Sequence, residues 1–220
     1  MKRLIPTTAM ALSMLMLAGA PLSAAEPEDA VQADWILDKL ARPAPMRTGF
    51  VELRESRLLK TPLRISGEYR RPADGVLVRE VRAPYAETTT ITTGEATIER
   101  AGKSPRTFSL SRAPELAGLQ ASFGALLSGD RTALSEHYAI TSTGTRNHWK
   151  LTLTPKGEEL AQQVRDIVLY GRGAELRCIE TRTPADAQPQ RTLLASAARA
   201  AGQADDAAAF AGLCHGDGSR

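Results

Sequence analysis

The sequence predicts an α+β fold in which a curved antiparallel sheet has one apolar face and is covered by two helices. Residues 28–41 and 114–128 carry apolar side chains at helical spacing,. Between and after these segments, short β-rich runs alternate apolar and polar residues and are separated by residues that favour turns,. No period of about 20 to 50 residues repeats along the chain, so a solenoid or propeller is not expected.

The N-terminus has the features of an export signal. Lys2 and Arg3 precede an apolar stretch from Ala9 to Ala18, and the small residues at Ala24 and Ala25 suit cleavage by signal peptidase,. The stretch is shorter than the roughly 20 apolar residues that a membrane helix needs. We therefore interpret residues 1–25 as a cleaved signal peptide. Residues 26–196 then form one domain, and the alanine-rich residues 197–220 form a C-terminal tail with helical potential.

Charge gives little indication of a partner. Without the signal peptide the chain has 26 basic and 25 acidic residues, so the pI near 9.0 is no argument for nucleic acid. The charge is uneven, because residues 42–82 carry ten basic and five acidic residues. This segment could face an acidic partner or lipid phosphate, although solvated strand edges also use Lys and Arg.

The first helix is predicted over residues 28–41. Ile36, Leu37 and Leu40 follow a helical period, and prolines stop the helix after Ala41,. Trp35 lies nearly opposite this stripe, so the helix could contact other parts of the protein on both sides.

A β-meander is predicted to follow, with strands at 47–60, 62–71, 75–83, 86–93, 95–101 and 105–111. In the second strand Ile65, Gly67 and Tyr69 share one face, while polar residues occupy the other,. One side of this sheet is therefore expected to be buried and the other exposed.

The clearest helix is predicted over residues 114–128. Pro114 suits its first turn and Gly129 its end, and the helix has a continuous apolar stripe,. The stripe consists of Leu116, Leu119, Phe123, Leu126 and Leu127.

Four further strands are predicted at 136–143, 146–154, 164–172 and 174–182, with a short helical crossover at 155–163. Trp149, Leu151 and Leu153 alternate with polar residues. A single curved sheet that lines a cavity would present one apolar face in this way.

The sequence shows little sign of catalysis. It contains no Gly-x-Ser-x-Gly, His-Glu-x-x-His, Walker loop or Cys-x-x-Cys motif,. His137 and His148 are predicted on adjacent strands, but no carboxylate at fixed spacing accompanies them. Cys214 and His215 are adjacent in sequence, whereas thiol catalysis normally pairs distant residues. We expect no enzymatic activity, no cofactor and no metal site.

The two cysteines are better explained by a disulfide. Cys178 lies on a late strand and Cys214 in the tail, and an exported protein meets an oxidising compartment,. The bond would attach the tail to the sheet and would add roughly 3.5 to 4 kcal/mol by the chain-entropy relation.

The order of these elements resembles the LolA family of periplasmic lipoprotein carriers, especially its divergent LolA-like branch. The resemblance rests on an exported chain, an N-terminal helix, a meander with Gly67-x-x-x-Arg71-Pro72 and a later Ala83-Pro84, a mid-chain amphipathic helix and further strands. It covers most of residues 30–195. It implies a half-open antiparallel β-barrel of roughly 10 to 11 strands, covered by the two helices.

The resemblance also implies a function and a site. A family member carries the acyl part of a lipoprotein or (glyco)lipid through the periplasm, from an inner-membrane exporter to an outer-membrane acceptor. Arg71 matches the family arginine that holds the lid and governs its opening. The implied apolar cavity and lid consist of Phe50, Ile65, Tyr69, Trp149, Leu151, Leu153 and the helix stripe Leu116, Leu119, Phe123, Leu126 and Leu127. We expect a monomer without nucleic-acid partners.

The sequence leaves two other functions open. The same half-barrel could act in a sensor of mislocalised lipoproteins of the RseB type, but about 195 mature residues leave little room for a second, signalling domain. A periplasmic hydrolase would need a nucleophile with a base, and none is evident.

Overall fold

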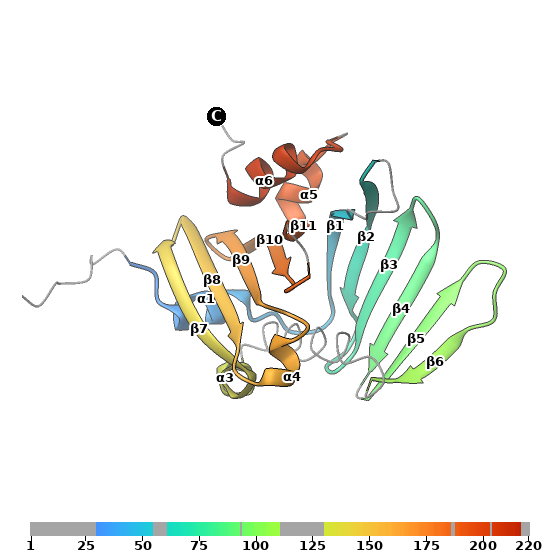
Figure 1. Cartoon of the computed structure of the whole chain (residues 1–220), viewed down its shortest axis with the longest axis horizontal. Coiled ribbons are helices and arrows are strands. Elements are labelled where there is room, and N and C mark those ends of the chain that lie inside the picture. The colour runs from blue at the N-terminus through green and yellow to red at the C-terminus, as the bar shows by residue number, and fades with distance from the viewer. Residues whose placement is uncertain are drawn as a thin grey trace, which may run out of the picture.

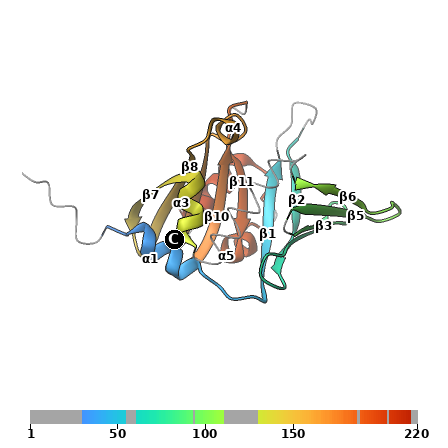
Figure 2. The ribbon, with the colours of Figure 1, turned by 90° about the horizontal axis from the view of Figure 1, so that it is seen from below.

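Within the residues that the computed structural model describes, eleven strands form one antiparallel sheet. These residues are 30–54, 61–92, 94–110, 130–185, 188–202 and 204–216. The strands lie in the order β6-β5-β4-β3-β2-β1-β11-β10-β9-β8-β7. β6 and β7 are therefore the two edges, and the sheet bends without closing into a barrel (Figures 1 and 2).

The strands fall into two meanders that meet at β1 and β11. The first contains β1 (Met46–Arg54), β2 (Leu63–Arg71), β3 (Leu77–Ala83), β4 (Glu87–Thr92), β5 (Glu95–Arg100) and β6 (Arg106–Ser109). The second contains β7 (Tyr138–Thr145), β8 (His148–Pro155), β9 (Asp166–Arg172), β10 (Glu175–Arg182) and β11 (Gln190–Leu194). β11 pairs with β1 on one side and with β10 on the other, so it joins the two halves.

Helices cover both faces of the sheet. On the inner face, which carries Phe50 and Leu151, α1 (Ala33–Leu40) contacts β7, β8 and β10. α3 (Arg131–His137) contacts β7, and Figure 2 shows both helices beside this half of the sheet. On the outer face, which carries Val51 and Leu193, α5 (Ala195–Ala200) and α6 (Ala207–His215) contact β10 and β11 (Figure 1). The short α4 (Glu158–Ala161) contacts β8.

The fold class predicted from the sequence is confirmed. β1 to β6 overlap the six predicted runs between residues 47 and 111, and β7 to β10 overlap the four later ones. α1 lies within the predicted helix 28–41, and α4 lies within the predicted crossover 155–163. The helix predicted at 114–128 lies outside the described residues.

Two elements were missed. Residues 131–137 form α3, whose first turn is capped by the Asp130 carboxylate, which accepts a hydrogen bond from the Ala133 amide at 3.0 Å,. The strand predicted from residue 136 therefore begins at Tyr138, and His137 ends a helix instead of lying on a strand beside His148. β11 was overlooked because its two consecutive leucines, Leu193 and Leu194, are buried on opposite faces, which removes the polar alternation of a half-exposed strand,.

Among the described helices, none is long and apolar enough to cross a membrane.

Candidate functional site

Apolar side chains form a continuous cluster on the inner face. Strands send alternate side chains to opposite faces, and the register places Leu151 of β8 opposite Leu169 of β9,. The predicted cavity residues that the structure describes all belong to this cluster, and none is more than 7% exposed: Phe50, Ile65, Tyr69, Trp149, Leu151 and Leu153. Side chains of α1, including Ile36 and Leu37, complete it.

Trp149 closes the cluster near the β9–β10 hairpin. Its ring lies against Gly171, where a Cβ atom would collide with it. The indole N–H donates a hydrogen bond to the Gly173 carbonyl at 2.9 Å. Trp149 thus packs as a hydrogen-bonded core residue, as buried tryptophans usually do.

A pocket of about 200 Å³ opens at one end of the inner face. It lies where β1 begins, β2 ends and the β9–β10 hairpin turns. Its lining is mainly apolar or aliphatic, with arginines beside it: Leu40, Met46, Thr48, Tyr69, Leu77, Ala174, Leu176, Leu194 and Ala195, together with Arg42, Arg47, Arg70, Arg71 and Glu175. We call it the mouth pocket. Sites for drug-sized ligands usually measure roughly 300 to 1,000 Å³, so the mouth pocket suits only part of such a molecule.

Tyr69 connects the mouth pocket with the buried cluster. Among the described residues predicted to form the cavity, it alone lines the pocket. Its ring centroid lies 4.7 Å from that of Phe50. Burial raises the pKa of the Tyr69 phenol, while the guanidinium of Arg79 opposes part of this rise and the Glu52 carboxylate adds to it. The hydroxyl is therefore protonated at neutral pH.

A buried charge on the inner face was not predicted from the sequence. Glu52 is 2% exposed, and its Oε2 atom lies 3.2 Å from a nitrogen of Arg79. Its Oε1 atom accepts hydrogen bonds from Gln190 at 2.7 Å and from Arg54 at 3.0 Å. These partners satisfy a carboxylate that would otherwise be costly to bury.

Arg79 balances Glu52 inside the apolar cluster. Its guanidinium carbon lies 4.9 Å from the centroid of the Phe50 ring. Burial alone would lower the pKa of Arg79, but Tyr69 and Glu52 outweigh that effect and raise it. The inward position of Glu52 could have been predicted from the sequence. Glu52 lies two residues after Phe50 on the same strand, so the two side chains point to the same face,.

Arg71, predicted to gate a lid, is the last residue of β2 and lies in the wall of the mouth pocket. Its side chain is 8% exposed and donates a hydrogen bond to the Arg42 carbonyl at 2.6 Å. It also binds the exposed Asp74 carboxylate at 2.5 Å. Arg42 in turn donates to the Ala174 carbonyl at 3.2 Å. The segment between α1 and β1 is therefore tied to both sides of the pocket.

The remaining predicted lid residues are Leu116, Leu119, Phe123, Leu126 and Leu127. They lie outside the described residues, and their part in the site stays a prediction.

On the outer face, a disulfide joins Cys178 of β10 to Cys214 of α6, with an S–S distance of 2.04 Å. It lies in a second apolar cluster that includes Val51, Leu193 and Phe210. The bond attaches α6 to the sheet on the face opposite the mouth pocket.

Glu180 lies beside this disulfide and is 1% exposed. Burial favours its neutral form, but hydrogen bonds from Arg191 at 2.6 Å and His215 at 2.9 Å outweigh burial and hold the pKa of Glu180 below its usual range. Ligand-type atoms of Glu180, Cys214 and His215 lie within 4.8 Å of one another. The Cys214 sulfur is part of the disulfide, however, so it offers no thiolate to a metal ion,.

Comparison with known proteins identifies one matching family. A family model described as outer membrane lipoprotein carrier protein LolA-like matches residues 24–218. No curated protein sequence matches the chain significantly. Among solved structures, the LolA superfamily protein NE2245 from Nitrosomonas europaea aligns with 13% sequence identity and a TM-score of 0.39, covering 76% of this chain and 91% of that one.

Proposed function

The chain belongs to the family of LolA-like outer membrane lipoprotein carrier proteins, and on that premise we propose that it is a periplasmic carrier for an acyl-bearing cargo. The cargo is a lipoprotein or a (glyco)lipid, received at the inner membrane and delivered to the outer membrane. The mouth pocket takes part of the acyl chain. The observation that carries the proposal is an apolar pocket that opens from the inner-face cluster through Tyr69.

The lining of the mouth pocket supports acyl binding. Leu77, Leu176 and Leu194 come from three different strands and offer non-directional contact. Each methylene group that leaves water for such a surface contributes about 0.8 kcal/mol, or about fourfold in affinity. Contacts of this kind bind a chain without recognising one particular head group, which suits a protein that must also release its cargo.

The arginine network supports a gated pocket. Arg71 donates to the Arg42 carbonyl, and Arg42 reaches the Ala174 carbonyl across the mouth. Breaking these hydrogen bonds would free the segment that leads from α1 into β1. We propose that Arg71 holds this segment closed over an empty pocket or a short bound chain, and that its hydrogen bond to Arg42 breaks when a longer chain enters or leaves.

A chain-length series tests the proposal. Fatty acids of increasing length are titrated into the purified protein in competition with a fluorescent acyl probe. We expect affinity to rise by about fourfold per methylene until the available space is filled, and then to level off. A fully folded protein that binds none of the fatty acids, acyl probes or lipopeptides at high micromolar concentration would contradict the carrier function.

A pocket-filling variant locates the binding. Thr48 lines the mouth pocket on β1, so Thr48→Phe keeps a residue that favours strands while it occupies space in the pocket,. If the ring displaces two methylene groups of the ligand, affinity falls by about 15-fold. Thr141→Phe, on an exposed position of β7, is the matched control and should bind normally. Equal affinities of the two variants would place acyl binding elsewhere.

The cargo itself can be identified directly. Native mass spectrometry of the protein, purified gently from periplasm, should detect a retained acyl-bearing molecule. Its mass separates a lipoprotein from a (glyco)lipid.

A further inference from the structure

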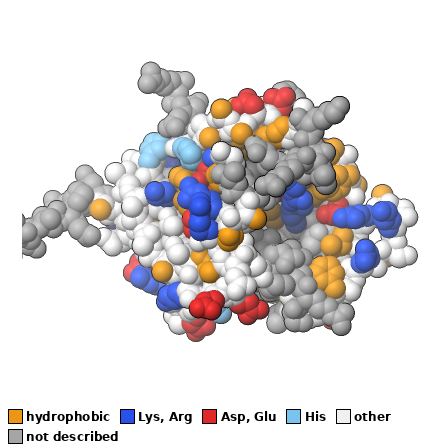
Figure 3. All heavy atoms as spheres, in the orientation of Figure 1, with side chains coloured by type: hydrophobic (Ala, Val, Ile, Leu, Met, Phe, Trp, Pro, Cys, Tyr) orange, Lys and Arg blue, Asp and Glu red, His pale blue; other side chains and the backbone are white. Residues whose placement is uncertain are grey.

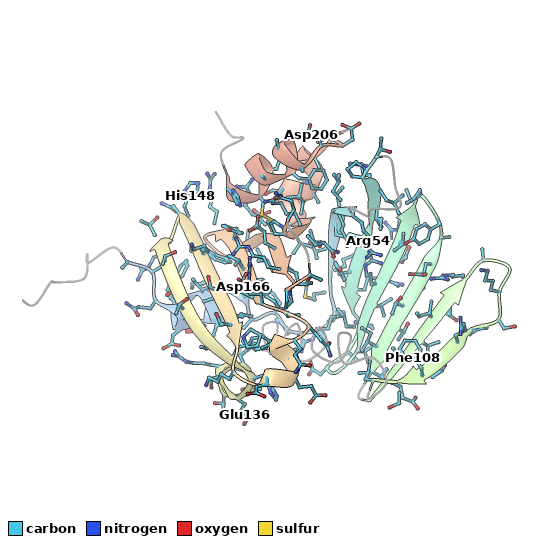
Figure 4. The ribbon with its side chains drawn as sticks, in the orientation of Figure 1. Arg54, Phe108, Glu136, His148, Asp166 and Asp206 are labelled. Atoms are coloured by element: carbon cyan, nitrogen blue, oxygen red, sulfur yellow. A yellow bond between two sulfur atoms is a disulfide. The ribbon has the colours of Figure 1, made fainter. Side chains whose placement is uncertain are left out.

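A second pocket of about 200 Å³ lies on the outer face, where the β7–β8 hairpin, β10 and the end of α6 meet. We call it the outer pocket. Figure 4 labels His148 at this end of β8. The pocket is lined by Thr143, Gly144, His148, Trp149, Lys150, Tyr170, Gly171, Arg177, Cys214 and His215. The mouth pocket shares none of these residues.

The outer pocket is rich in hydrogen-bond donors and positive charge. Lys150 and Arg177 bring two permanent cations, and His148 and His215 add imidazole rings. No Asp or Glu occurs among the described residues that line it. Arg172 lies just behind, with a guanidinium nitrogen 3.1 Å from Nε2 of His148. In Figure 3, histidine side chains at this place lie next to Lys and Arg side chains.

Arg177 is directed to this pocket by an irregularity of the sheet. The pairing of β10 with β9 shifts register between Leu176 and Cys178, so Arg177 occupies a β-bulge. Bulges re-aim a side chain and are frequent beside functional sites. The Nε atom of Arg177 is shielded from solvent and has no hydrogen-bond partner among the described residues. A buried donor of this kind is normally satisfied, so the Nε–H of Arg177 can still bind one further acceptor,.

The disulfide holds the two sides of the outer pocket together. Cys178 follows Arg177 in β10, and Cys214 precedes His215 in α6. The bond therefore sets the spacing between these two donors before any ligand arrives. A prearranged group of donors loses less freedom on binding than one that must assemble.

The end of α6 offers a simpler explanation for part of this charge. The C-terminal end of a helix carries a partial negative charge that attracts cations. That attraction explains why Arg177 and His148 lie close to the capping residue Gly216. The attraction of the helix end does not account for the Nε donor of Arg177, however, because that donor makes no hydrogen bond with the described residues of the helix end.

We propose that the outer pocket binds a small phosphate-bearing anion, independently of the acyl site. A guanidinium group matches phosphate oxygens with paired N–H donors, and Lys150 can complete the shell. Nε2 of His215 is held by Glu180 and Nε2 of His148 by Arg172, so the imidazoles border the site without donating these atoms to it. The pocket volume suits a single small group,. A divalent cation would face two fixed positive charges, and the Glu180 carboxylate behind Tyr170 and His215 is already paired with Arg191. Free phosphate and the phosphate of a lipid head group share the chemistry that this site recognises.

Calorimetric titration with inorganic phosphate at low ionic strength tests the proposal on the full mature chain. We expect saturable binding to wild type that weakens by about tenfold to a hundredfold in Arg177→Gln, which loses a charged hydrogen-bond donor. Arg106→Gln, an exposed change on β6, is the matched control and should bind like wild type. Circular dichroism and acyl-probe affinity should be unchanged in both variants, which separates this site from the carrier function.

Two further probes distinguish the source of the phosphate. Glycerol phosphate and vesicles with or without phosphatidylglycerol are each tested for competition with inorganic phosphate. Competition by the anionic vesicles alone indicates a membrane head group, whereas competition by the soluble esters alone indicates a free metabolite. Nuclear magnetic resonance provides a second readout, because the imidazole signals of His148 and His215 should shift on phosphate addition. Absence of binding by all three probes, or equal binding by wild type and Arg177→Gln, overturns the proposal.

Discussion

Replacement of Arg71 by leucine should loosen the mouth of the protein without unfolding it. The hydrogen bond from the buried guanidinium to the Arg42 carbonyl is charge-assisted, and such bonds contribute about 1.5 to 3 kcal/mol,. The Asp74 side chain is 85% exposed, so its ion pair with Arg71 adds at most about 1 kcal/mol,. The local opening equilibrium of the α1–β1 segment should therefore rise by about tenfold to a hundredfold.

Hydrogen exchange and ligand exchange measure this opening separately. In Arg71→Leu we expect faster exchange of the amides near Arg42 and faster dissociation of a short acyl probe that binds while the segment is closed. The control variant Arg100→Leu removes a half-exposed arginine that pairs with Glu87 and does not line the mouth pocket, and it should change neither rate by more than a small factor,. Unchanged amide exchange and unchanged dissociation in Arg71→Leu, with normal folding, would remove Arg71 from the gating mechanism.

Three further predictions concern stability. Exported protein should contain no free thiol under denaturing conditions, and reduction of its disulfide, which links residues 36 apart, should lower the free energy of unfolding by about 4 kcal/mol, measured by urea denaturation with and without reductant,. Because the pKa of Glu180 is lowered in the folded state, its contribution is present above the ordinary carboxyl pKa of about 4.3 and is lost as pH falls below it,. The stability difference between wild type and Glu180→Gln should thus narrow in melting curves recorded from pH 7 down to about pH 3, and a constant difference would contradict the lowered pKa. Gly171→Ala should displace the Trp149 ring and destabilise the protein by about 1 to 3 kcal/mol with a change in tryptophan fluorescence, whereas Gly49→Ala, whose added Cβ would lie 3.8 Å from its nearest neighbour, should have little effect on either readout,.

The sheet could be predicted because its two faces have different surroundings. Ile65 and Tyr69 on β2, and Leu151 and Leu153 on β8, alternate with more exposed residues, so a period of two marks both strands and their inward faces,. The same signal predicted that these residues share one face. It did not reveal which of them border open space, because a cavity wall and a packed core have the same composition.

The mouth pocket could not be predicted because its lining comes from distant positions. Leu40 ends α1, Leu77 begins β3 and Leu194 ends β11, and only the paired register of β1 with β2 and β11 brings these elements together. The periodicity of one strand can be recognised in a single sequence, but the pairing between distant strands cannot.

The helical potential of residues 197–220 agrees with α6 and with most of α5, but the sequence did not indicate which face of the sheet these helices cover. In α6, alanine and glycine surround the few large residues, such as Phe210, so no apolar stripe stands out from the sequence. The buried Glu52 also contradicts the simple rule that inward positions are apolar. Arg54 is a partner on the same strand, but Arg79 and Gln190 lie on two other strands, so most of the network around Glu52 could not be predicted from the sequence.

Because the mouth pocket is small, the proposed cargo binding depends on the hydrogen bonds that Arg71 and Arg42 make beside it. At about 200 Å³ the pocket is smaller than the sites that enclose whole drug-sized ligands, so a long acyl chain needs additional space,. One source of space is α1, whose Ile36, Leu37 and Leu40 fill part of the inner face and whose exit segment Arg71 holds. If the acyl chain displaces α1, part of the binding free energy of the chain is used to break the hydrogen bond between Arg71 and the Arg42 carbonyl. A variant without this bond does not incur that cost, so it binds the chain more tightly. Arg71→Leu should then bind long fatty acids more tightly than wild type does, while short ones that fit the existing pocket bind equally to both. Equal affinities of the two proteins along the whole series would show that α1 stays in place when cargo binds.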